Sequence, residues 1–172
     1  MTKAPPLLPD EVLRRVLRVA RLDGTGLLAI AGAFALASAW AHDRTGTVAG
    51  LLVAGAGAIE LHGAGLLHAG HGRGANWLIA SQLFLMAAVF GYVAWQLGHV
   101  DTAALAALMN DDVRQQLKPY HLTEAEFLRL AYVGFYRLLA VLTAAYQGGM
   151  AIYYARRRAA MLAALAAGEG HD

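Results

Sequence analysis

Long apolar runs alternate with short polar connections along this chain. A helix rising 1.5 Å per residue needs about 20 apolar residues to cross a hydrocarbon layer about 30 Å thick. Each run is close to that length or longer, and charged residues are nearly absent from them. The pattern predicts four transmembrane helices, over residues 24–41, 45–69, 75–98 and 123–167, the last containing the apolar run Leu130–Ala155.

The composition agrees with this pattern. Hydrophobic residues make up 58% of the 172 residues and charged residues 15%, whereas soluble domains carry about 25% charged residues. The chain has no cysteine, which excludes disulfides and thiolate metal sites. We therefore expect an all-α, polytopic membrane protein that forms a single domain, an antiparallel bundle of four transmembrane helices.

Basic residues predict the orientation, because Lys and Arg near span ends favour the cytoplasmic side. Nine of them precede the first span, lie between the second and third, or follow the fourth. We expect both termini to be cytoplasmic, in a bacterial cytoplasmic membrane. These nine residues are Lys3, Arg14, Arg15, Arg18, Arg21, Arg73, Arg156, Arg157 and Arg158.

Residues 9–22 alternate arginines with apolar residues at helical spacing. We predict an N-terminal amphipathic helix lying at the membrane interface, with Arg14, Arg15, Arg18 and Arg21 on anionic headgroups; the alternative is a soluble extension of the first span. Cleavage after Ala39-Trp40-Ala41 is a further alternative, but the apolar run before it exceeds a typical signal core.

Residues 99–122 are predicted as an external loop that contains a short helix. An apolar stripe on this helix covers the outer mouth of the bundle or the bilayer surface, or else binds a partner protein. Thr123 and Glu126 then form a capping box that starts the fourth helix. The stripe consists of Leu105, Leu108, Met109, Val113 and Leu117.

Polar residues recur at one depth of the bundle. By helix rise, Glu60 lies about 22 Å from the outer edge and His62 about 25 Å. Counting along the third and fourth spans brings four more polar side chains to about the same depth. The predicted polar layer, in the cytoplasmic half, consists of Glu60, His62, Ser81, Gln82, Tyr146 and Gln147.

Ionisable residues inside a membrane are costly and need a partner or water. Glu60 is therefore either part of a structural hydrogen-bond network or a protonatable gate or cation site on a transport path. Arg137 lies about 10 Å from the outer edge, where we expect a structural cation of the outer half that reaches Asp43 or stacks on Tyr92 or Tyr136.

The histidines are weak metal candidates. Only His68 and His71, three residues apart, could act together, and a tetrahedral site needs further ligands. We predict no metal, no haem and no other cofactor.

The second span is rich in small residues. Gly46, Gly50 and Ala54 recur every four residues and form a ridge that allows close helix approach. The ridge serves packing within the bundle or self-association of the protein.

No nucleophile arrangement, zinc-protease motif, nucleotide loop or nucleic-acid module occurs in the sequence. We predict that the protein is not an enzyme. The favoured hypothesis is a small homo-oligomeric channel or transporter with the Glu60 layer on its path, and the alternative is a non-catalytic accessory or scaffold protein.

Overall fold

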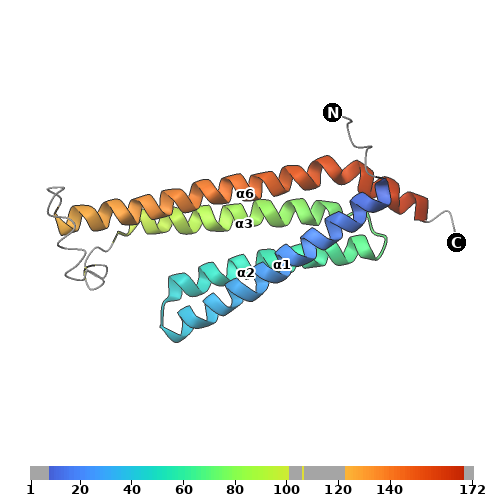
Figure 1. Cartoon of the computed structure of the whole chain (residues 1–172). Coiled ribbons are helices and arrows are strands. Elements are labelled where there is room, and N and C mark those ends of the chain that lie inside the picture. Colours follow the sequence, from blue (N-terminus) through green and yellow to red (C-terminus); the bar gives the residue numbers. More distant parts are fainter. Residues whose placement is uncertain (1–7, 101–105, 107–122, 169–172) are drawn as a thin grey trace, which may run out of the picture. The chain divides into compact units, whose positions relative to one another are not determined.

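The structure, a computed structural model, describes residues 8–100, 106 and 123–168 and is helical throughout these parts apart from short turns. Four helices are long and apolar enough to cross a membrane, which confirms the prediction of four apolar helices. The region predicted as an external loop, with its apolar stripe, lies outside the described residues except for residues 99, 100 and 106. The helices are α1 (Pro9–Trp40), α2 (Arg44–His68), α3 (Gly74–Gly98) and α6 (Glu124–Gly168) (Figure 1).

The first helix differs from the prediction. Residues 9–22 and the first span form one uninterrupted helix, α1, rather than an interfacial helix followed by a turn. Its apolar side chains Val12, Val16 and Ala20 are buried in a core cluster with Tyr154 and others, so they are covered by protein and are not free to lie on lipid. The segment is therefore an extension of the first span, held there by burial of its apolar face.

Close packing joins α1 and α2, which form an antiparallel hairpin (Figure 1). A Cβ atom added to Gly57 would lie 2.7 Å from the carbonyl oxygen of Gly24, and one added to Gly50 would lie 2.9 Å from the Cα of Ala35. Only glycine fits such backbone approaches.

The predicted small-residue ridge of α2 packs against α1 of the same chain. Gly46, Gly50 and Ala54 are buried, and Gly46 and Gly50 approach Ser38 and Ala35 of α1. Packing inside the chain accounts for the burial of these three residues, and self-association of the protein remains a prediction.

Local capping defines two helix starts. The Asp43 carboxylate accepts a hydrogen bond from the backbone amide of Gly46 at 3.0 Å, which caps α2. At α6 the Glu126 carboxylate accepts from the backbone amide of Thr123 at 2.9 Å, and the Glu126 amide donates to the Thr123 hydroxyl at 3.3 Å. These reciprocal bonds confirm the predicted capping box.

The described residues fall into two compact units. The first, within Met1–Ala88 and Ala144–Asp172, contains α1, α2, the first part of α3 and the last part of α6. Its buried core includes Val16, Leu67, Leu78, Tyr154 and Met161. The second unit, Val89–Thr143, contains the end of α3 and the start of α6.

Candidate functional site

A carboxyl group from α2 lies at the centre of the first unit. Glu60 is 0% exposed. The hydroxyl of Tyr154 on α6, itself fully buried, donates a hydrogen bond of 2.6 Å to Oε1 of Glu60. A carboxyl group with one neutral donor in an apolar setting is expensive to leave charged, so its presence here marks a candidate site.

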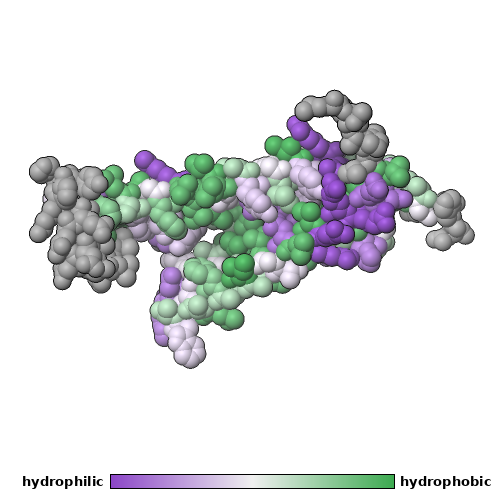
Figure 2. Space-filling view, in the orientation of Figure 1, coloured by the Kyte–Doolittle hydropathy of each residue, from purple (hydrophilic) through white to green (hydrophobic). Residues whose placement is uncertain are grey.

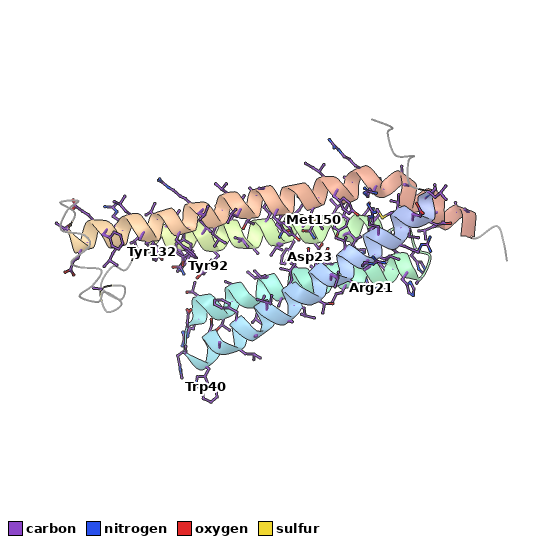
Figure 3. All side chains as sticks on the ribbon, in the orientation of Figure 1. Arg21, Asp23, Trp40, Tyr92, Tyr132 and Met150 are labelled. Carbon is purple, nitrogen blue, oxygen red and sulfur yellow. The ribbon has the colours of Figure 1, made fainter. Side chains whose placement is uncertain are left out.

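A second carboxyl group reaches the same place from α1. Asp23 accepts a hydrogen bond of 3.1 Å from the hydroxyl of Tyr146, also on α6. The Asp23 and Glu60 carboxyl groups are close enough to interact with each other. The bond to Tyr146 shows that the Asp23 side chain faces α6, whereas Arg21, two residues earlier and so about 200° away round α1, is exposed; both residues are labelled in Figure 3.

Amide groups complete this layer. Gln82 of α3 is 0% exposed and lies close enough to Glu60 to act on its carboxyl group. Gln147 of α6 is also buried, and it shares a helix face with Tyr154, seven residues further on.

The layer is rich in polar atoms that lack a hydrogen-bond partner in the described part of the chain. Four helices contribute them: α1, α2, α3 and α6. Buried polar groups in folded proteins are normally hydrogen-bonded, so a concentration of unbonded ones needs an explanation. The atoms are Oδ2 of Asp23, Oε2 of Glu60, Oε1 and Nε2 of Gln82, Oε1 of Gln147 and the hydroxyl of Tyr153.

Two predicted members of the layer do not take part in it. The Ser81 hydroxyl is buried but donates to the carbonyl of Leu78 in its own helix at 2.8 Å. His62 is exposed and contacts the edge of Trp77, with ring centroids 5.4 Å apart. Glu60, Gln82, Tyr146 and Gln147 remain, although Tyr146 is half exposed and holds Asp23 rather than Glu60.

Sequence reasoning missed Asp23 and Tyr154. Asp23 directly precedes the predicted first span, residues 24–41, and Tyr154 lies near the end of the apolar run of the fourth span. Tyr146 and Tyr154 are eight residues apart, about 80° round the helix, which places both towards one side of α6. That spacing could have indicated from the sequence that both tyrosines face the same buried layer.

The second unit holds a different polar group of side chains (Figure 3). The Gln96 amide donates to the Tyr92 hydroxyl at 2.8 Å, and the Tyr132 hydroxyl donates to Oε1 of Gln96 at 2.8 Å. The Tyr92 and Tyr136 rings pack edge to face. Here both ends of the glutamine amide are hydrogen-bonded.

Arg137 lies in this second unit. It is exposed and lines a hollow of about 500 Å³ on α6 together with Glu126, Arg129, Leu130 and Val133. The predicted contacts of Arg137 with Asp43, Tyr92 or Tyr136 remain predictions.

No cluster of three or more histidine, aspartate or glutamate side chains with metal-binding geometry occurs among residues 8–100 and 123–168. His68 and His71 are both exposed. Among the described residues, no group of His, Asp or Glu side chains forms a metal-binding cluster around them.

Comparison with protein-family models, with curated proteins and with solved structures finds no match for this chain.

Proposed function

We propose that this chain is a small membrane protein that moves a cation, either a proton or a metal ion, across the bilayer by way of the layer around Glu60. The observation that carries the proposal is the buried Glu60 carboxyl, surrounded by polar atoms from four helices that lack protein partners in the described residues. An ionisable group inside a membrane is a functional site by default.

The alternative is a structural hydrogen-bond network in a scaffold or accessory protein. Such a network stabilises a bundle when its members satisfy one another, and it destabilises when they do not. The Gln96 group in the second unit fits that description, since its amide bonds to two tyrosine hydroxyls. Gln82 does not fit it, since neither end of its amide has a partner in the described residues. This contrast favours a binding role for the Glu60 layer.

A membrane setting is supported by the four apolar helices. Figure 2 shows hydrophilic surface over the start of α1 and the end of α6, within the first unit. We propose that Arg14, Arg15, Arg18 and Arg21, all exposed, contact anionic headgroups there. Positive residues at this end favour a cytoplasmic position for both termini.

A single unit of four helices rarely encloses a pore, so we expect two or more copies to form the transport path. The molecular mass of the protein in detergent tests this expectation. A strict monomer would favour an alternating-access carrier over a pore.

The deciding experiment is cation flux into liposomes that contain the purified protein. A pH-sensitive dye reports proton entry driven by a potassium diffusion potential, and Glu60→Gln should abolish the flux. Ser81→Ala is the matched control: Ser81 is equally buried, but its hydroxyl bonds within its own helix, so flux should persist.

Loss of flux in both variants would point to damaged packing rather than to a cation site. If the wild-type protein conducts neither protons nor metal ions, and Glu60→Gln only lowers thermal stability, the scaffold hypothesis is correct and the transport proposal is wrong.

A further inference from the structure

The first unit carries a groove of about 410 Å³ that three helices line together. Most of its wall is apolar. Leu13 and Leu17 come from α1, Leu67 from the last turn of α2 and Leu165 from the end of α6. The volume lies within the range of about 300–1,000 Å³ that is usual for small-molecule sites. The groove therefore has room for part of a discrete molecule, and its apolar wall favours hydrocarbon.

The end of α2 shows where the groove lies relative to the bilayer. Leu67 and His68, the last two residues of α2, both line it. The 25 residues of α2 make a helix about 38 Å long, which is more than the hydrocarbon core of about 30 Å. A helix of that length that crosses the bilayer has its last turn among the headgroups. The groove thus lies at the depth of lipid phosphates.

Two basic side chains complete the wall. Arg14 follows Leu13 on α1, and His68 ends α2. None of the described residues that line the groove is acidic. A guanidinium group matches phosphate oxygens with parallel hydrogen bonds, and an imidazole N–H is a further donor. The wall therefore combines donors for an anion with a surface for hydrocarbon.

We propose that this groove binds one anionic phospholipid. Arg14 and His68 hold its phosphate, and its acyl chains lie on the leucines before they enter the bilayer. A phospholipid carries phosphate and hydrocarbon in one molecule at this depth. A zwitterionic headgroup would bring a second cation beside Arg14, where the groove has no acidic side chain to receive it among the described residues, so the headgroup is anionic.

This inference rests on the membrane setting of the proposed function but not on cation transport. It also differs from the general attraction of basic residues to headgroups. Arg15, Arg18 and Arg21 are exposed on the same helix, and they do not line the groove. Only a bound lipid requires Arg14 and the leucines together.

Native mass spectrometry of the full-length protein in a neutral detergent measures this binding. Phosphatidylglycerol and phosphatidylcholine with the same acyl chains are titrated separately. We expect one phosphatidylglycerol molecule to bind saturably and about tenfold more tightly than phosphatidylcholine, because charge-assisted hydrogen bonds differ in strength by about that factor from neutral ones.

Arg14→Gln should weaken phosphatidylglycerol binding about tenfold. Arg156→Gln is the matched control, because it removes the same charge from an exposed position of α6 outside the groove, and it should retain the affinity. Ala164→Leu extends a larger side chain from the apolar wall and should weaken binding without a change of charge. If Ala164→Leu does not fold, Leu17→Ala removes contact area from the same wall and should also weaken binding.

The outcomes separate this inference from the proposed function. Equal weakening by Arg14→Gln and Arg156→Gln would overturn it in favour of diffuse attraction. Equal affinity for phosphatidylcholine, or for glycerol 3-phosphate, which has no acyl chains, would also overturn it. Wild-type protein that binds one phosphatidylglycerol but moves no cation would support the lipid site and refute transport. Cation flux that depends on Glu60, with no saturable lipid binding, would do the reverse.

Discussion

Replacing two glutamines of the same helix by leucine should change stability in opposite directions. Gln82 and Gln96 both lie on α3, but only Gln96 has its amide bonded to other side chains in the described structure. Leucine is close to glutamine in size, so both substitutions keep most of the packing volume.

The magnitudes follow from the hydrogen bonds. A buried polar group without a partner is destabilising by about 1–3 kcal/mol, so Gln82→Leu should stabilise the protein by about that amount. Gln96→Leu removes two hydrogen bonds of 2.8 Å, each contributing about 0.5–1.5 kcal/mol. It should destabilise by about 1–3 kcal/mol.

Unfolding by SDS in mixed micelles, followed by far-ultraviolet circular dichroism, measures both changes on one scale. The measurement should be made in choline buffer without metal cations, because a bound ion could otherwise add to the stability of the wild type. If Gln82→Leu destabilises as much as Gln96→Leu, the Gln82 amide has a structural partner and the Glu60 layer is a structural network.

Three further substitutions test the packing, the site and a helix cap. Gly57→Ala should destabilise by about 1–3 kcal/mol through overpacking against Gly24, whereas Gly55→Ala meets nothing within 4 Å and should be neutral or slightly stabilising in the same SDS titration. Tyr154→Phe removes the donor to Oε1 of Glu60 and should lower stability by about 1–3 kcal/mol, and flux measurements on the same variant should show whether it also impairs transport. At the start of α6, hydrogen bonds from the hydroxyl and the backbone amide of Thr123 lower the pKa of Glu126; the cap therefore stabilises above the ordinary glutamate pKa, and its contribution is lost as pH falls through the lowered value. NMR titration should find that Thr123→Ala moves the pKa of Glu126 back towards its ordinary range, and an unchanged value would contradict the capping bonds.

The four helices were predictable because the signal is long and simple. Apolar runs of membrane-spanning length can hardly be anything else, and their ends carry residues that stop or cap helices, such as Asp43 and Thr123. It was harder to predict from the sequence that residues 9–22 and the first span form one continuous helix. Arginines spaced among apolar residues fit an interfacial helix and a buried one equally well, and only tertiary contacts of Val12, Val16 and Ala20 decide between them.

The candidate site was predictable in part, and the errors have a common cause. Depth counting places residues along the membrane normal but says nothing about which way a side chain points. Glu60 and Gln82 are both buried and interact with each other, whereas the side chains of His62 and Ser81, predicted at the same depth, make their contacts elsewhere. Asp23 was excluded because the first span was assumed to start after it.

The small residues and the polar layer are separate features of the sequence. In the structure they are neighbours, because the close contact between α1 and α2 lies next to the two carboxyl groups. Gly57 lies three residues before Glu60 on α2 and therefore on nearly the same helix face. Gly24 directly follows Asp23 on α1. A Cβ at position 57 would lie 2.7 Å from the carbonyl oxygen of Gly24, and one at position 24 would lie 3.0 Å from the side chain of Leu61. Because the two backbones touch here, the short side chain of Asp23 reaches the neighbourhood of Glu60. A larger residue at either glycine would separate the helices where the carboxyl groups meet. We therefore expect the two glycines to determine whether Asp23 lies close to Glu60, and so whether the layer contains one acid or two.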